Sequence, residues 1–354
     1  MSASSVIAFS VQFNRYASIP VFICGIIGNI FNILIFTRPR LIKNPCSTYF
    51  FWASVANINV LLFGLVSRFL SDGFGIDPVS NNLGFCRFRY FILHSSMTLS
   101  SWFTILAGID RYFVSSRSAR RRQLSNLTNS RYLVALTTFT GLAAYSHALG
   151  LFTIEMLKTG PSCYAQSGTY RIFYDFFYFA TYSFTPPIIM IGVGLATFHN
   201  IHQLRSRVVS TATSERNHSH LKRRDRQLIK MALLQFICTA ILTLPIAIQK
   251  IYATFTQNIS KNAYQLAIES FITQLMRLFV FINSSISFYV FISSGSGFRY
   301  ELGGIIVGSV RYIFGEDSRL YGQMQNYFET SIVINVDHLN RTATVVRNNV
   351  KLDS

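Results

Sequence analysis

Long apolar stretches separated by short polar segments fill most of the chain. Seven such runs can be distinguished, at about 17–37, 47–70, 86–112, 132–154, 170–198, 228–252 and 266–293. An α-helix rises about 1.5 Å per residue, so roughly 20 apolar residues cross the ~30 Å hydrocarbon core of a bilayer. The pattern therefore predicts an all-α membrane protein, a bundle of seven transmembrane helices.

The third run is bounded by residues with distinctive chemistry. It begins at Cys86 and ends with Asp110, Arg111 and Tyr112. A helix of this length places Arg111 roughly 37 Å from Cys86, so the two residues lie at opposite membrane interfaces. An arginine beside an acid at the membrane boundary is costly unless it is paired, which indicates a functional role. The alternative is an arginine that reaches out to lipid headgroups.

Charge distinguishes the two sides of the predicted membrane. Only 13% of the 354 residues are charged, against about 25% in soluble domains, and the net charge is +18. The basic residues gather in alternate loops, after the first, third and fifth runs. Because such loops stay in the cytoplasm, we predict a multi-pass plasma-membrane protein with its N-terminus outside. No basic segment precedes the first run, so we expect no cleavable signal peptide.

Cysteine placement bears on disulfides and metals. The five cysteines show no CxxC spacing, and we predict no metal site and no cofactor. In the predicted orientation only Cys86 and Cys163 lie on the extracellular side, which is the oxidising side. They are therefore the two cysteines positioned to form a disulfide.

A short amphipathic helix is predicted after the seventh run. Phe298, Leu302 and Ile306 recur at helical spacing there, so the helix would lie on the inner membrane surface. The predicted organisation has four parts, namely an extracellular N-terminus (1–16), a seven-transmembrane domain (17–297), the amphipathic membrane-surface helix (298–315) and a cytoplasmic tail (316–354).

Several short motifs occur at characteristic positions within these apolar runs. They are Gly28-Asn29, Ser54-Val55-Ala56-Asn57, Asp110-Arg111-Tyr112, Pro186-Pro187, Pro245 and the block Asn283–Phe291. With Cys86 and Cys163, their joint spacing resembles the rhodopsin-like (class A) G-protein-coupled receptors over about residues 17–300. The resemblance implies a receptor, not an enzyme, that binds an extracellular ligand and activates a heterotrimeric G protein. It also implies a disulfide between the two cysteines.

Other positions depart from the family pattern. The fourth run has no tryptophan, and Leu242-Thr243-Leu244-Pro245 stands where the family favours Cys-Trp-x-Pro. The seventh run lacks the family's proline and also its tyrosine, because Phe291 occupies that place. Activation is therefore expected to use other contacts.

The resemblance assigns a signalling switch to Asp110, Arg111 and Tyr112. Asp225 lies twenty residues before Pro245, where many family members hold the acid that pairs with the arginine. A charge-assisted pair of this kind would hold the third and sixth helices together at rest, and its opening would expose a cleft for the G protein. The alternative is that Asp225 only neutralises the arginines beside it.

A polar network is predicted in the middle of the bundle. In the family, an acid takes the place of Asn57 and the cluster holds sodium. Amide and hydroxyl oxygens alone hold a monovalent cation poorly, because dehydrating it is costly, so we predict a water-filled network instead. Its residues are Asn29, Asn57, Ser100, Asn283, Ser284 and Ser287.

A ligand pocket is expected at the extracellular ends of the helices. Its candidate residues are Arg68, Arg89, Leu93, His94, Met97, Gln249 and Arg277. The arginines could bind an anionic group of the ligand, but outward-reaching arginines or pairs with Asp72, Asp175, Glu155 or Glu269 are favoured. By the family resemblance, Leu93 stands at the third-helix position where amine receptors keep an aspartate, so it offers no counter-ion for a protonated amine. Phe281 stands at the seventh-helix position where opsins keep the retinal lysine. A peptide is therefore the expected ligand.

Two other classes of protein remain as alternatives. A transporter or channel is one, although an odd number of runs without internal repeats argues against it. An intramembrane enzyme is the other, but the sequence holds no HExxH or GxSxG motif. The expected partners are a G protein, an extracellular ligand and the lipid bilayer, and no nucleic acid.

Overall fold

The computed structural model describes residues 2–157, 160–208, 216–256, 259–314 and 323. It divides into a bundle, Met1–Gly295, and a second unit, Ser296–Ser354, each of which is described by itself. The elements of the bundle are α1 (Ala3–Phe36), α2 (Pro45–Asn59), η1 (Val60–Leu65), α3 (Val66–Phe74), α4 (Pro78–Asn81), α5 (Leu83–Ser115), α6 (Ala119–Gln123), α7 (Leu127–Tyr145), α8 (Ala148–Leu151), β1 (Phe152–Leu157), β2 (Gly160–Ala165), α9 (Thr169–Tyr178), η2 (Phe179–Phe184), α10 (Thr185–Val208), α11 (Arg216–Phe255) and α12 (Ala263–Ser294).

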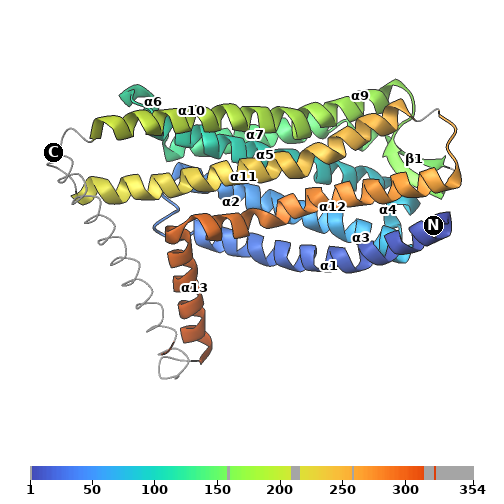
Figure 1. Ribbon diagram of the computed structural model, residues 1–354, viewed down its shortest axis with the longest axis horizontal. Helices are drawn as coiled ribbons and strands as arrows, with labels where there is room; N and C mark the ends of the chain where they lie inside the picture. The colour runs from blue at the N-terminus through green and yellow to red at the C-terminus, as the bar shows by residue number, and fades with distance from the viewer. Residues whose placement is uncertain (1, 158–159, 209–215, 257–258, 315–322, 324–354) are drawn as a thin grey trace. The chain divides into compact units, whose positions relative to one another are not determined.

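The long helices of the bundle run side by side (Figure 1). Within the described residues, six helical stretches are long and apolar enough to cross a membrane, and five of them reach 30 residues or more. The seventh, α7, is shorter, with 19 residues, and four threonines reduce its apolar character. At 1.5 Å per residue it still spans about 28 Å. The all-α, seven-helix architecture expected from the apolar runs is confirmed.

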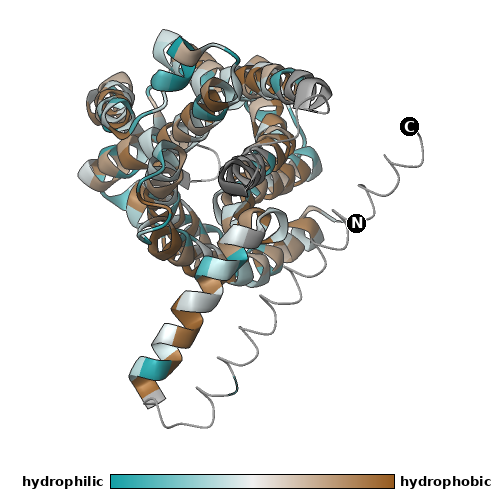
Figure 2. Cartoon of the chain, turned by 90° about the vertical axis from the view of Figure 1, so that its left-hand side faces the viewer, coloured by the Kyte–Doolittle hydropathy of each residue, from teal (hydrophilic) through white to brown (hydrophobic). Residues whose placement is uncertain are grey.

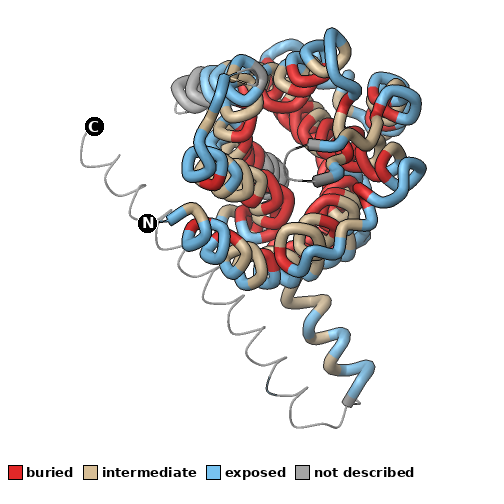
Figure 3. The backbone as a smooth tube through the Cα atoms, turned by 90° about the vertical axis from the view of Figure 1, so that its right-hand side faces the viewer, coloured by how far each residue is buried: buried red, intermediate tan, exposed pale blue. Residues whose placement is uncertain are grey.

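The bundle carries apolar side chains on its outside and many polar ones inside. On α1, Ile23, Ile27 and Ile30 are exposed, whereas Asn29 and Asn32 on the opposite face are fully buried. Figure 3 shows buried residues toward the centre of the bundle and exposed ones on its outside, and Figure 2 shows that apolar residues fill much of its helices. This distribution suits a protein surrounded by lipid, in which polar groups must find partners within the bundle.

Two π-helical turns interrupt the long helices. The first, η1, joins α2 to α3, and the Val66 N–H donates to the Leu61 carbonyl five residues back instead of four. The second, η2, joins α9 to α10 in the same manner. A π turn shifts the helix face by the angle of one residue and leaves carbonyls available for other donors, so such turns often occur at functional sites.

A β-hairpin closes one end of the bundle. Strands β1 and β2 are antiparallel, and Ile154 lies opposite Cys163. A disulfide between Cys86 and Cys163, with Cα atoms 5.9 Å apart, ties the hairpin to the start of α5. We call this end of the bundle the disulfide end and the opposite one, where α5 finishes, the Arg111 end.

The hairpin corrects the expected fourth helix, which was predicted to run from 132 to 154. Helix α7 ends at Tyr145, and the apolar residues from Phe152 onward form β1 instead. Phe152 is fully buried and packs against the rings of Tyr90 and Tyr174. Apolar sequence alone did not separate a buried strand from a helix, because both bury such residues.

The N-terminal segment 1–16 was expected to precede the first helix, but α1 already begins at Ala3. The Ser2 hydroxyl caps it by accepting from the Ser5 N–H at 3.3 Å. This first part of α1 packs on α12, where Ser10 Oγ donates to Gln274 Oε1 at 2.6 Å and Phe13 contacts Phe271. Contacts with a second helix therefore extend α1 beyond its apolar run.

The second unit contains one long helix in its described part. Helix α13 covers Ser296–Phe314, which agrees closely with the amphipathic helix predicted over 298–315. Its attachment to the inner membrane surface stays a prediction.

Candidate signalling and ligand-binding sites

Arg111 lies in the last turns of α5 and is 2% exposed. Its Nε donates to Asp110 Oδ2 at 3.1 Å, and its Nη2 contacts the same carboxylate oxygen. The same Nη2 also donates to Asn44 Oδ1 at 2.9 Å. Asn44 begins α2 as its N-cap and accepts from the Cys46 N–H at 3.0 Å. The guanidinium therefore joins the foot of α5 to the start of α2.

The acid beside Arg111 holds the following loop. Asp110 is 4% exposed, and its Oδ1 accepts a hydrogen bond from the Ser125 hydroxyl. The Tyr112 hydroxyl accepts from Arg121 Nη1 at 2.9 Å, which attaches α6 to α5. All three residues of the Asp-Arg-Tyr motif thus have partners outside their own helix.

The predicted partner of Arg111 was Asp225. Its backbone belongs to α11, but its side chain lies outside the described part of the structure. The Arg111–Asp225 pair therefore stays a prediction. The contacts that sequence reasoning missed are Asn44 and Ser125. The Asn-Pro pair at Asn44 and Pro45 is a recognisable helix start, whereas nothing in the sequence marks Ser125.

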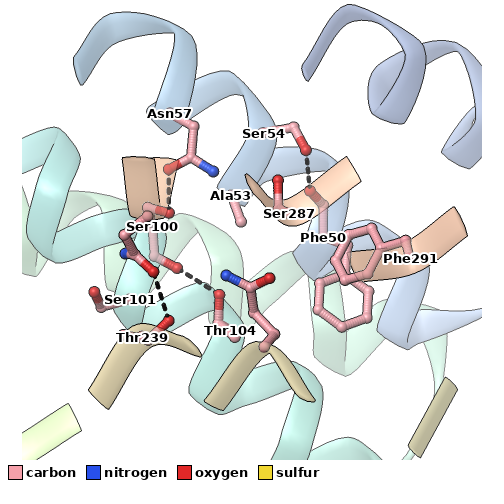
Figure 4. Close-up of a pocket in the computed structure, with 12 residues that line it drawn as sticks. Phe50, Ala53, Ser54, Asn57, Ser100, Ser101, Thr104, Thr239, Ser287 and Phe291 are labelled. Atoms are coloured by element: carbon pink, nitrogen blue, oxygen red, sulfur yellow. Dashed lines mark hydrogen bonds between the residues drawn. The ribbon is translucent and has the colours of Figure 1, made fainter. Parts of the chain in front are cut away.

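A polar cavity lies between α2, α5, α11 and α12 (Figure 4). Ser100 Oγ donates to Asn57 Oδ1 at 2.6 Å, and Thr239 Oγ1 donates to Asn283 Oδ1 at 3.0 Å. The space open to water-sized molecules is about 10 Å³, which is room for about one water. The polar residues that line the cavity are Ser54, Asn57, Ser100, Ser101, Thr104, Gln235, Thr239, Asn283 and Ser287.

Two residues of the predicted network serve a different contact. Asn29 Nδ2 donates to the carbonyls of Gly25 at 2.8 Å and Ser284 at 2.9 Å, so both Asn29 and Ser284 join α1 to α12. Ser287 lines the cavity and also accepts from Asn32 Nδ2 at 3.1 Å. The network is therefore divided between the cavity and a helix–helix contact.

The cavity has neutral donors and acceptors. Its lining contains amides and hydroxyls and no carboxylate, and the buried Gln235 Oε1 accepts no hydrogen bond. A water molecule there would supply the missing donor. Among the residues that the structure describes, no group of three or more His, Cys, Asp or Glu side chains is arranged to hold a metal ion.

The disulfide end gathers the predicted arginines around one acid. Asp72 lies between Arg68 Nη1, at 3.8 Å from Oδ1, and Arg277 Nη2, at 3.5 Å from Oδ2. Arg68 Nη2 also donates to the Tyr90 hydroxyl at 3.2 Å. Arg68, Asp72, Arg277 and the neighbouring Arg89 are called the arginine cluster below.

Arg89 has partners of another kind. Its Nε donates to Ser67 Oγ at 2.6 Å and to the Phe63 carbonyl at 3.0 Å, and the residue is 2% exposed. Phe63 belongs to the π turn η1, whose shifted backbone presents this carbonyl to α5. Among the described residues no acid lies within ion-pair distance of Arg89.

Lys250 is a functional candidate that sequence reasoning missed. Its Nζ lies 3.7 Å from Asp175 Oδ1, donates to the Tyr164 hydroxyl at 3.1 Å and sits 4.2 Å from the ring centre of Tyr178. A lysine within the apolar sixth run is the signal that could have indicated it.

The other acids named as possible partners lie elsewhere. Glu269 pairs with Lys261 at 2.7 Å. Glu155 accepts hydrogen bonds from the Ser167 hydroxyl and N–H, and these bonds hold the pKa of the Glu155 carboxyl below its ordinary value. Neither acid contacts the arginine cluster in the described structure, so Asp72 is its acid partner.

The remaining pocket candidates are packed inside the bundle. Leu93 and Met97 belong to the apolar core with Val60, Leu61 and Phe281. His94 is 5% exposed, and its Nδ1 is hydrogen-bonded to the Tyr90 carbonyl at 3.1 Å. Its ring lies against those of Tyr174 and Tyr178. Gln249 Nε2 donates to Thr273 Oγ1 at 3.1 Å, which joins α11 to α12.

Seven helices with a buried Asp-Arg pair at one end and a disulfide-anchored hairpin at the other define the class of seven-helix membrane receptors. The sequence model of the family described as 7 transmembrane receptor (rhodopsin family) matches residues 28–287. The chain belongs to this family and is therefore a rhodopsin-like G-protein-coupled receptor. No individual curated protein matches the chain.

Proposed function

We propose that this receptor binds an extracellular peptide at the disulfide end and activates a heterotrimeric G protein at the Arg111 end. The observation that carries the proposal is the buried Arg111, a charge at the end of α5 that is held by Asp110 and by Asn44 at the start of α2. Burying a guanidinium is costly and must be compensated by partners. Such a group is suited to a switch whose partners change between two states.

The proposed resting state holds Arg111 in place. Asp110 and Asn44 bind the guanidinium at rest, and Asp225 on α11 pairs with it across the bundle. A ligand that moves α11 away from α5 separates Arg111 from Asp225. The guanidinium then binds the G protein in the opened cleft.

A peptide is proposed as the ligand because the anchors of two other ligand classes are missing. Leu93 and Phe281 are apolar and packed in the core, so neither an amine nor retinal finds its charged or reactive partner there. Tyr90, Tyr164 and Tyr174 pack ring against ring at the disulfide end, so the region proposed to receive the ligand is built from aromatic side chains.

The proposed location is the plasma membrane, with the N-terminus outside. The basic segments after the first and third runs lie toward the Arg111 end, and the disulfide lies at the other end. An N-terminal epitope tag is expected to bind antibody on intact cells, and a C-terminal tag only after permeabilisation. The reverse labelling would contradict the proposal.

The experiment that tests the function measures guanine-nucleotide exchange on several G-protein classes in cell membranes. Asp225→Asn keeps the side-chain size but removes the charge, so basal exchange should rise several-fold at matched surface levels. Arg111→Ala should abolish exchange in response to a peptide agonist found by library screening.

A matched control is Arg120→Ala, which removes an exposed arginine of the nearby α6. It should leave both basal and agonist-driven exchange close to the wild-type level. Normal coupling by Arg111→Ala would contradict the proposal. Flux of an ion or solute without nucleotide exchange would instead favour the transporter or channel alternative.

A further inference from the structure

We propose that the arginine cluster binds a carboxylate group of the extracellular ligand, with Arg277 and Arg68 as its two binding residues. The inference rests on the proposed receptor function, because it names a chemical group of that ligand. It begins from an imbalance of buried charge at the disulfide end.

Cations outnumber acids in the arginine cluster. The cluster holds three guanidinium groups, on Arg68, Arg89 and Arg277, and one carboxylate, that of Asp72, which among the described residues lies within ion-pair distance of Arg68 and Arg277 only. The nearby Asp175 faces Lys250. Asp77 attracts Arg68 electrostatically, but its carboxylate is bound to the N–H groups of Val79 and Ser80 as the cap of α4, so the three arginines still outnumber the acids near them. Excess positive charge in a poorly hydrated place is unfavourable until an anion joins it.

Arg277 has hydrogen-bonding capacity that the bundle does not use. Its Nε is buried and has no hydrogen-bond partner. Its contact with Asp72, at 3.5 Å, is longer than a normal charge-assisted hydrogen bond. A guanidinium presents a fork that fits the two oxygens of a carboxylate, so Arg277 can bind a further carboxylate in addition to Asp72.

The two binding residues are accessible and held in place. The side chains of Arg68 and Arg277 are 28% and 26% exposed, whereas Arg89 is closed off against η1. Tyr90, which accepts from Arg68, lies one helical turn after the disulfide-bonded Cys86. The disulfide therefore fixes the wall against which Arg68 rests, and a fixed arginine loses little entropy when it binds.

Arg89 adds charge to the site without binding the ligand directly. Its guanidinium is bound to Ser67 and the Phe63 carbonyl, which are uncharged. Its positive charge is therefore not neutralised by an acid and increases the attraction for an anion at Arg68 and Arg277. The cluster selects for negative charge by electrostatics and for a planar group by the shape of the guanidinium.

The test uses the full-length receptor, purified in detergent, and small probes in matched pairs. N-acetylphenylalanine and its amide differ only in the charge of a terminal carboxylate. N-acetylglutamate amide and N-acetylglutamine amide differ in the charge of a side-chain carboxylate. Thermal unfolding at constant ionic strength reports binding, because a ligand of the native state raises the midpoint.

At least one acid should raise the unfolding midpoint while its matched amide does not. The pair that shows the difference identifies the source of the carboxylate as a chain terminus or an acidic side chain. Arg277→Gln should weaken the acid by about tenfold or more, as expected for loss of a charge-assisted bond. Asp72→Asn should strengthen binding of the acid, because it removes the carboxylate that competes for both arginines.

Lys261→Gln is the matched control, since it removes a positive charge at the same end but outside the cluster. It should leave the difference between acid and amide unchanged. Equal shifts for acid and amide in the wild type would overturn the inference, as would an unchanged acid effect in Arg277→Gln. If Arg277→Gln does not fold, Asp72→Asn tests the inference. Stronger binding of the acid would support it, and unchanged or weaker binding would overturn it. These readouts need no G protein, so failure of signalling and failure of carboxylate binding are distinguishable.

Discussion

Arg111 at the end of α5 and Asn44 at the start of α2 are joined by a hydrogen bond of 2.9 Å that the sequence pattern did not indicate. Asn44→Ala removes this acceptor, so the resting position of Arg111 should be less stable. A hydrogen bond to a charged group contributes about 1.5–3 kcal/mol, so basal nucleotide exchange should rise by several-fold to tenfold. Exchange measured in membranes at equal receptor density tests this.

Two further substitutions separate signalling from helix capping, because Asn44 also caps α2. Asn44→Asp keeps the cap and adds a negative charge next to Arg111, so basal exchange should fall below the wild-type level. Asn44→Ser keeps the cap but does not reach the guanidinium, so basal exchange should rise. Equal exchange in all three variants would show that this bond plays no part in the switch.

The disulfide should be needed for a stable disulfide end. Replacing Cys86 or Cys163 by serine releases the β1–β2 hairpin from α5. Losing a disulfide typically costs about 2–5 kcal/mol, and surface expression should fall accordingly. The double variant should be no worse than either single variant, because both remove the same bond. Labelling of Cys86 by a thiol reagent in the non-reduced surface protein would contradict the pairing.

Close packing of α1 makes Gly25 sensitive to substitution. A Cβ atom at this position would lie 2.7 Å from Leu61 Cδ1 and closer still to the Ser285 hydroxyl. Gly25→Ala should therefore lower stability by about 1–3 kcal/mol through overpacking. Gly192→Ala on α10 is the control, because nothing lies within 4 Å of its added Cβ. It should raise stability by about 0.5–1 kcal/mol, since alanine favours the helix. Thermal unfolding of the purified variants measures both.

Asp77, in the loop before α4, should make stability depend on acid pH. Burial acts to raise the pKa of this carboxyl, but hydrogen bonds from Ser80 outweigh it, and the pKa lies below its ordinary value. Its stabilising contribution is therefore complete above the unfolded pKa of about 4 and is lost as the pH falls through the lower folded pKa. Asp77→Asn should keep the cap and lose this dependence. Unfolding midpoints measured between pH 3 and pH 7 should differ between wild type and variant near neutrality and converge at the acid end.

The seven-helix architecture, the disulfide and the position of the Asp-Arg-Tyr motif could all be predicted from the amino-acid sequence. Apolar runs of about 20 residues or more are stable in a bilayer as membrane-spanning helices, so the number and order of the helices follow from the apolar runs along the chain. Two boundaries were wrong, the end of α7 and the start of α1. Phe152, expected in the fourth helix, lies in strand β1. Ser10, expected before the first helix, lies within α1, where it donates a hydrogen bond to Gln274.

Which charged groups contact one another depends on the packing of the helices and could not be predicted from the sequence. The sequence placed Arg68, Arg89 and Arg277 at one end but did not distinguish the arginine that contacts backbone carbonyls from the two that share Asp72. The reason is η1, whose one extra residue rotates all later positions of that helix by about 100° relative to a regular α-helix. The same holds for Lys250, whose partners Tyr164 and Asp175 come from a strand and a helix far away in the chain. Contacts of this kind depend on the packing of whole elements, which local periodicity does not specify.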